Sequence, residues 1–204
     1  MTATVLGTLL VLLASTAVEP APAPTRCDVL VYGGTPGGIA AAIAASRDGA
    51  RVVLVEPTRH VGGLVTSGLS HTDFRTFEGL SGLYLDFARR VEAHYRQVYG
   101  AESEQVRACR RGTQAEPHVN ERVFEQMLAE QPTLRVCKGL RLASLQLGGT
   151  PDTRRSITSV AFTTTDGPMR EEFSSLVFVD ATYEGDLMAR AGVANRVGRE
   201  GRDE

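Results

Sequence analysis

The chain has 204 residues and a formal net charge of −2 at pH 7, with 42% hydrophobic and 23% charged residues. These values are ordinary for a globular protein, and the length suits one domain or at most one and a half. A charge so close to zero, with no long run of Lys and Arg, argues against a nucleic-acid partner. Glycine is the unusual component, at 21 residues.

The first 24 residues differ in composition from the rest of the chain. An uncharged apolar stretch runs from Val5 to Val18 and is too short and too weakly flanked for a membrane span. We expect residues 1–24 to be a signal peptide, cleaved after Ala17, with a Pro/Ala linker up to Pro24. The protein would then be exported to the periplasm or the extracellular space, with no stable membrane span after cleavage. An uncleaved anchor, or a start codon placed too early, is the alternative.

The next segment has the pattern of a βαβ unit. Residues 27–32 form an apolar run typical of a buried parallel strand, and it is closed by two glycines. The alanine-rich residues 39–48 predict a helix, and residues 51–56 predict a second buried strand that ends in an acid. Strand, glycine turn, helix and strand in close succession predict an α/β fold, a Rossmann-like parallel sheet with crossover helices.

The remaining elements follow from the spacing of apolar residues and from the turn residues between them. In chain order they are a glycine-rich loop at 57–76, a helix at 80–99, an irregular stretch at 101–116, a helix at 117–128, strands at 134–136, 140–147, 157–165 and 176–180, and a short helix at 187–191. The alternating runs at 140–147 and 157–165 predict a small antiparallel β excursion from the parallel sheet.

The turn after the first strand reads Gly-Gly-Thr-Pro-Gly-Gly at residues 33–38. Aligned with the G-x-G-x-x-G pattern, Gly33 and Gly38 supply the first and third glycines, and Thr35 stands in the second place. The first glycine permits a tight turn, the third lets the helix approach the sheet, and the second normally lets the backbone approach a pyrophosphate. The N-terminus of the following helix offers free N–H groups to phosphates. With its strand and helix context, the turn predicts a dinucleotide site.

Glu56 ends the second strand, 18 residues beyond Gly38. A carboxylate at this place accepts hydrogen bonds from the ribose hydroxyls of an adenosine, and it would repel a 2′-phosphate. An exposed acid at a strand end, with no ligand, is the alternative. The βαβ unit and Glu56 serve NAD and FAD equally well.

Two further segments favour FAD over NAD, because they resemble segments of a known protein family. Residues 56–68, EPTRHVGGLVTSG, look like the second segment of FAD-dependent oxidoreductases of the glutathione reductase structural class. Residues 179–189, VDATYEGDLMA, resemble the strand-end signature of the same class. Together with the turn at 33–38, they make the chain similar to the N-terminal part of the FAD-dependent oxidoreductase family, over roughly residues 28–204.

The resemblance implies FAD as the cofactor and a set of contacts to it. The implied residues are Gly33, Gly34, Thr35, Pro36, Gly37 and Gly38 at the pyrophosphate, Glu56 at the ribose, Gly62 and Gly63 on the other side of the phosphates, Thr66 and Ser67 nearer the ribityl chain or flavin ring, and Asp180, Ala181 and Thr182 closing over the cofactor. For Asp180, capping of the following helix is an equal alternative. His71 and Asp73 are candidates to face the flavin ring, although polar loop residues more often only meet solvent. No catalytic residue is assigned.

The function that follows is an FAD-dependent oxidoreductase with an unknown small-molecule substrate. Members of the family are usually much longer, so residues 25–204 are expected to be an FAD-binding domain truncated at its C-terminus. A catalytically incompetent nucleotide-binding remnant is therefore the main alternative. An NAD-dependent dehydrogenase is a third, and the glycine pair at 62–63 speaks against it. Cys27, Cys109 and Cys137 have no metal-ligand spacing, so no metal site is expected.

Overall fold

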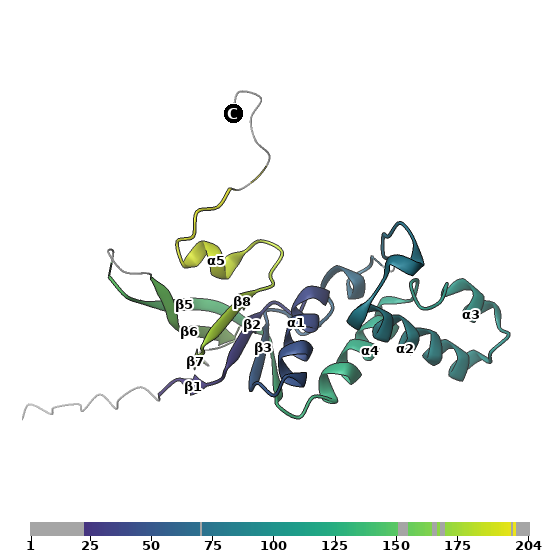
Figure 1. Cartoon of the computed structure of the whole chain (residues 1–204), viewed down its shortest axis with the longest axis horizontal. Helices are drawn as coiled ribbons and strands as arrows, with labels where there is room; N and C mark the ends of the chain where they lie inside the picture. Colours follow the sequence, from purple (N-terminus) through teal and green to yellow (C-terminus); the bar gives the residue numbers. More distant parts are fainter. Residues whose placement is uncertain are drawn as a thin grey trace, which may run out of the picture.

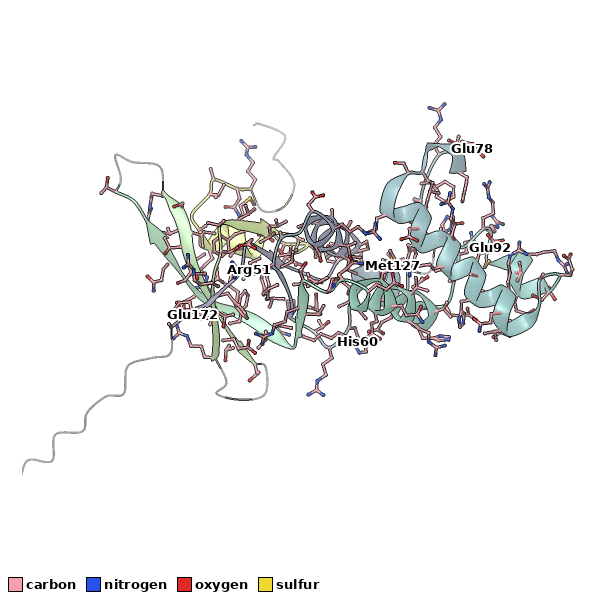
Figure 2. The ribbon with its side chains drawn as sticks, turned by 60° about the horizontal axis from the view of Figure 1, so that its bottom comes forward. Arg51, His60, Glu78, Glu92, Met127 and Glu172 are labelled. Carbon is pink, nitrogen blue, oxygen red and sulfur yellow. The ribbon has the colours of Figure 1, made fainter. Side chains whose placement is uncertain are left out.

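A computed structural model describes residues 23–69, 71–150, 155–164, 167, 170–196 and 198 of the chain. The expected signal peptide lies outside the described residues. The strands gather at one end of the molecule, and helices α2 to α4 form an arm at the other end (Figure 1). Glu78 and Glu92 lie on this arm, at the opposite end from Arg51 and Glu172 (Figure 2).

A four-stranded parallel sheet confirms the predicted Rossmann-like architecture. Its strands, in the order β4-β3-β2-β8, are β4 (Leu134–Lys138), β3 (Val52–Glu56), β2 (Val29–Tyr32) and β8 (Val177–Asp180). All three pairings are parallel. From β2 the chain adds β3 and β4 on one side, then returns to place β8 on the other. The carboxyl ends of β2 and β8 therefore meet at a topological switch point, the usual place for a ligand in such sheets.

Helix α1 (Pro36–Arg47) connects β2 to β3 and begins three residues before the predicted start. The reason is a side-chain cap, which the apolar spacing does not reveal. Thr35 has extended backbone angles (φ −68°, ψ 165°), and its side chain accepts a hydrogen bond from the N–H of Gly38. Pro36 occupies the first helical position, where its missing N–H costs nothing.

A second four-stranded sheet contains the predicted antiparallel excursion. In the order β1-β7-β6-β5, its strands are β1 (Thr25–Arg26), β7 (Arg170–Ser174), β6 (Ser156–Thr164) and β5 (Leu140–Gly148). Strands β5, β6 and β7 are antiparallel, whereas the edge strand β1 runs parallel to β7. The sequence pattern did not predict β1 or β7, because one has two residues and the other, REEFS, is mostly polar.

The other helices are α2 (Gly82–Tyr99), α3 (Glu104–Ala108), α4 (Pro117–Ala129), α5 (Asp186–Arg190) and the short 3₁₀ helices η1 (Gly63–Thr66) and η2 (Phe77–Gly79). Helix α3 lies in the stretch predicted to be irregular. It forms because Ser103 caps it through the N–H of Val106, whose side chain is buried. None of the described helices is long and apolar enough to span a membrane.

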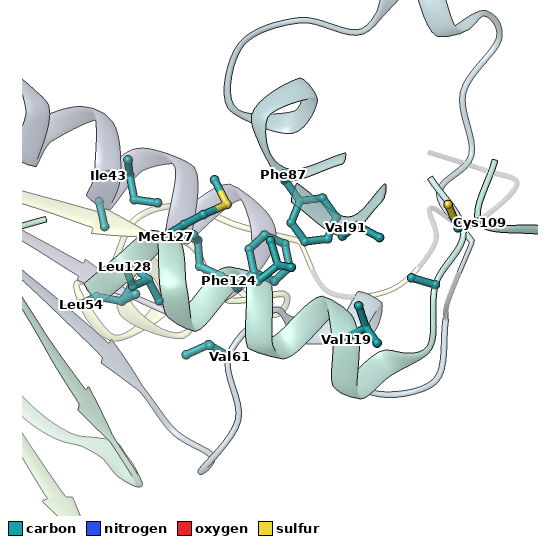
Figure 3. Close-up of a cluster of buried hydrophobic side chains, with 14 of the residues drawn as sticks. Ile43, Leu54, Val61, Phe87, Val91, Cys109, Val119, Phe124, Met127 and Leu128 are labelled. Atoms are coloured by element: carbon teal, nitrogen blue, oxygen red, sulfur yellow. The ribbon is translucent and has the colours of Figure 1, made fainter. Parts of the chain in front are cut away.

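The larger hydrophobic core joins α1, α2 and α4 to one face of the parallel sheet. Phe124 and Met127 of α4 face Phe87 of α2 and Ile43 of α1 (Figure 3). The rings of Phe87 and Phe124 are stacked, with their centroids 4.2 Å apart. Val61, which follows β3 in the chain, belongs to the same cluster, so helix α4 packs beside this residue.

Candidate functional site

A hollow of about 330 Å³ opens at the carboxyl ends of the parallel strands. Residues 56–58, His60, Arg141 and Asp186 form part of its wall. The rest comes from three segments, which we call the first glycine turn (residues 33–38), the second glycine turn (residues 62–67) and the β8 loop (residues 181–185). Of the residues predicted to bind cofactor, the structure places six on its wall, namely Gly33, Thr35, Glu56, Gly63, Ser67 and Thr182. Gly34, Pro36, Gly37, Gly38, Gly62, Thr66 and Ala181 belong to the same segments and Asp180 ends β8, but these residues do not line the hollow. The hollow is at the small end of the range for small-molecule sites.

A second hollow of about 520 Å³ lies next to the first and shares Pro57, Arg141 and Asp186 with it. Its wall includes Tyr32, whose hydroxyl accepts a hydrogen bond from the N–H of Leu142 at 3.1 Å. Burial raises the pKa of the Tyr32 phenol above its ordinary value. Together the two hollows offer room for a ligand longer than either one would hold.

Glu56 is the buried acid of the site, with 8% of its surface exposed. One carboxylate oxygen accepts a hydrogen bond from the N–H of Gly34 at 2.7 Å, and the other accepts one from the N–H of Thr58 at 2.8 Å. These two donors stabilise the charge and fix the direction of the carboxylate. Each oxygen has a further lone pair, so Glu56 remains able to accept hydroxyl donors from a ligand in the hollow.

Thr35, which replaces the middle glycine of the pattern, ties the first glycine turn to the β8 loop. Its hydroxyl donates to the carbonyl oxygen of Ala181 at 2.9 Å while it accepts from the N–H of Gly38 at 3.2 Å. The threonine side chain is therefore directed toward β8 and the helix.

The glycines of the first turn have different surroundings. A Cβ on Gly38 would overlap the carbonyl oxygen of Gly33, and a Cβ on Gly33 (φ +105°) would lie 2.6 Å from the carbonyl carbon of Ala181. A Cβ on Gly37 would meet only the Thr35 hydroxyl, at 3.9 Å. Among the described residues, the N–H of Gly37 has no acceptor. Gly33 and Gly38 are therefore needed for close packing, whereas Gly37 has open space beside it.

The second glycine turn is joined to the first by its backbone. Gly62 (φ +103°) donates its N–H to the carbonyl oxygen of Gly34 at 2.6 Å. The Thr66 hydroxyl shares its one hydrogen between the carbonyl oxygen of Val61, at 2.8 Å, and that of Gly63, at 3.1 Å. Thr66 thus holds the turn in shape, and Ser67 is the hydroxyl residue of the pair that lines the hollow.

Asp180 and Thr182 organise the β8 loop. One oxygen of Asp180 accepts from the N–H and the hydroxyl of Thr182, at 3.1 and 2.7 Å, and the other accepts from the N–H of Met188 at 2.8 Å. The Thr182 hydroxyl in turn accepts from the N–H groups of Gly185 and Asp186. The Asp180 carboxylate therefore makes the capping contacts of α5 that the sequence offered as the alternative to cofactor contact.

Two residues that support the site were missed in the sequence. Tyr183 accepts a hydrogen bond from the N–H of Leu64 at 2.9 Å and lines the hollow. Asn120, with 2% of its surface exposed, donates its side-chain amide to the carbonyl oxygen of Val65 at 3.2 Å. Asn120 interrupts the apolar face of α4, and a polar residue at such a position is a signal that sequence analysis can use.

The remaining candidates lie outside the hollow. His71 pairs with Gln114 at 2.9 Å and approaches Asp73 at 3.5 Å, and neither His71 nor Asp73 lines the hollow. Cys27, Cys109 and Cys137 are buried free thiols, and burial raises the pKa of each. Within the described part of the chain, no group of three or more His, Cys, Asp or Glu residues is arranged to hold a metal ion.

Comparisons with known proteins give the family and the fold of the chain. A family model described as FAD dependent oxidoreductase matches residues 28–204. Among solved structures, THI4 of Thermovibrio ammonificans is similar with a TM-score of 0.52 at 14% identity, over 83% of this chain and 64% of that one. L-proline dehydrogenase from P. horikoshii is similar with a TM-score of 0.51 at 14% identity, over 86% of this chain and 58% of that one. AlpK is similar with a TM-score of 0.51 at 16% identity, over 81% of this chain and 33% of that one. The chain thus spans less than two thirds of these proteins, and the likeness is one of fold.

Proposed function

Because the chain belongs to the family of FAD-dependent oxidoreductases, whose cofactor is FAD, we propose that residues 25–204 bind FAD through the β2-α1-β3 unit and serve an oxidoreductase. The observation that carries the proposal is the hollow at the switch point of the parallel sheet. The N-terminus of α1, a buried carboxylate and two glycine turns all converge on it.

The first glycine turn suits a diphosphate. Helix α1 has 12 residues, so its N-terminus carries the partial positive charge of a full helix. The free N–H of Gly37 and the open space beside its Cα leave room for a phosphate oxygen at this end. The side chain of Thr35 is held toward Ala181 and Gly38, so it does not fill that space.

Glu56 suits the adenosine ribose. Its two oxygens are held by backbone donors on one side and keep lone pairs for ribose hydroxyls on the other. Since its position is fixed before a ligand arrives, little ordering is needed on binding. The negative charge also disfavours a 2′-phosphate, which selects FAD over NADP-type ligands.

The flavin, when bound, supplies the hydride chemistry, and the protein supplies binding, orientation and electrostatics. Within the described residues, the chain contributes the adenosine and diphosphate contacts. The buried Asn120 and the core helix α4 support the second glycine turn from behind, so the turn faces the hollow as a fixed wall.

Absorption spectroscopy tests this proposal. The full chain is incubated with FAD, desalted and scanned in the visible range, and the dissociation constant is measured by titration. We expect a retained flavin spectrum, and binding about 10-fold or more weaker in Glu56→Gln, because a hydrogen bond to a charged group is worth about 1.5–3 kcal/mol.

Glu92→Gln is the matched control, since Glu92 pairs with Arg96 on the helical arm, away from the hollow. Its affinity for FAD should equal that of the wild type. A folded wild-type chain that retains no flavin would contradict the proposal. Unchanged affinity in Glu56→Gln would remove Glu56 from the site.

A further inference from the structure

Hydrogen bonds join the first glycine turn, the second glycine turn and the β8 loop in pairs. The N–H of Gly62 bonds to the carbonyl oxygen of Gly34 and so connects the two glycine turns. The Thr35 hydroxyl bonds to the carbonyl oxygen of Ala181 and connects the first glycine turn to the β8 loop. These two bonds leave one pair of segments to be joined, namely the second glycine turn and the β8 loop.

Tyr183 makes that third connection. Its phenol oxygen accepts the N–H of Leu64 at 2.9 Å, across 119 residues of sequence. The residue is 56% exposed, so it adds little to the hydrophobic core. Tyr183 also lines the hollow. An exposed tyrosine that is held in one place on the wall of a hollow acts on the shape of that hollow more than on the stability of the fold.

Gly63 leaves room for this phenol because it has no side chain. A Cβ on Gly63 would overlap the Tyr183 oxygen and would lie 3.0 Å from the ring carbon that carries it. The backbone of Gly63 is also left-handed, with φ +54°. The Tyr183 phenol thus occupies the space that a side chain on Gly63 would need. We call the pair of Gly63 and Tyr183 the contact unit.

We propose that Tyr183 is a positioning residue for the diphosphate of FAD. By holding the N–H of Leu64, its hydroxyl fixes the second glycine turn at its distance from the N-terminus of α1, so that the two walls fit one diphosphate. The inference rests on the proposed function and assigns a role within the same site. Without the hydroxyl, the second glycine turn loses one hydrogen bond to the β8 loop. Part of the free energy of FAD binding is then used to order this turn.

Tyr183→Phe tests the hydroxyl alone, because it keeps the ring and removes the acceptor. Dissociation constants are measured with the full chain for FAD, ADP and adenosine, the latter two by competition with FAD. We expect FAD and ADP to bind between about 2- and 10-fold more weakly, the range for one hydrogen bond. Adenosine binding and the melting temperature of the ligand-free protein should stay at wild-type values.

Tyr99→Phe is the matched control. Tyr99 is 48% exposed, is the last residue of α2 and stacks against Tyr95. Helix α2 lies on the helical arm, away from β8 (Figure 1). Equal weakening of all three ligands by Tyr183→Phe, no weakening, or tighter FAD binding would each overturn the inference. If the wild-type protein fails to bind FAD, both the proposed function and this inference are wrong. If wild-type protein binds FAD and the ratio of ADP to adenosine affinity does not change, only the inference falls.

A double-mutant cycle tests the contact unit. Gly63→Ala should weaken FAD binding in the wild-type background, because the added methyl group displaces the phenol. In the Tyr183→Ala background the phenol is gone, so the same change should have a smaller effect on affinity. An equal effect of Gly63→Ala in both backgrounds would show that Gly63 acts without Tyr183 and would overturn this role.

Discussion

Gly37 and Gly38 are neighbours in α1, and alanine at these two positions should have opposite effects on stability. At Gly38, a Cβ would overlap the carbonyl oxygen of Gly33 and would lie 2.9 Å from the Cβ of Ala181. The first of these neighbours is backbone in a turn that is fixed on both sides, so the turn itself must shift. At Gly37, the nearest atom is the Thr35 hydroxyl at 3.9 Å, an ordinary van der Waals distance.

The expected magnitudes follow from these distances. Overpacking typically costs about 1–3 kcal/mol, so Gly38→Ala should lower the free energy of unfolding by about that amount. Gly37→Ala adds a helix-favouring residue without a clash, and should raise it by about 0.4–1 kcal/mol. For a chain of this size, 1 kcal/mol corresponds to about 2–4 °C in melting temperature. The two variants should therefore differ by several degrees.

Thermal unfolding of the ligand-free chain, followed by circular dichroism, measures this difference. The comparison uses one type of substitution at adjacent positions of one helix, so helix propensity changes equally in both. If both variants melt at the same temperature, or if Gly38→Ala is the more stable, the close approach between the first glycine turn and the β8 loop does not limit stability and the reasoning is refuted.

Two further predictions concern ties between segments. Thr35→Val removes the cap of α1 and the donor to Ala181, and should lower the free energy of unfolding by about 1–3 kcal/mol in urea titrations, whereas Thr35→Ser should recover most of the loss. Asp28 accepts hydrogen bonds from the backbone and the guanidinium of Arg51, and these bonds lower the pKa of the Asp28 carboxyl to about 2. The contribution of Asp28 to the free energy of unfolding is therefore fully present above the ordinary pKa near 4 and is lost as pH falls through about 2. The melting-temperature difference between wild type and Asp28→Asn should therefore narrow as pH is lowered from about 5 to about 2, and a constant difference would contradict the assignment.

Local patterns in the sequence account for the centre of the fold. The strands β2 and β3 and the turn between them were predictable because apolar β-branched runs, glycines and an alanine-rich helix occur in direct succession. Strand β7 was missed because its side chains are mostly polar, and only pairing with β6 and β1 defines it. Helix α3 was missed because five residues give no measurable period.

The candidate site was predictable only where its residues belong to a local turn. The first glycine turn and Glu56 follow from residues close together in the chain. By contrast, Asn120 bonds to a residue 55 positions away, and Tyr183 to one 119 positions away. No periodicity or turn pattern encodes such contacts, because they arise only when α4 and β8 have taken their places beside the second glycine turn.

The bond between Thr35 and Ala181 also sets the earliest time at which the first glycine turn and the β8 loop can meet. It joins residues 146 positions apart, and at a synthesis rate of about 5–20 residues per second this corresponds to an interval of about 7–29 s on the ribosome. Throughout that time Thr35 lacks the carbonyl oxygen of Ala181 to which its hydroxyl donates in the folded protein, and loop closure over this length delays the contact further. The walls of the hollow can therefore close only after residue 181 has been synthesised, and we expect cofactor uptake to follow the formation of the β8 loop.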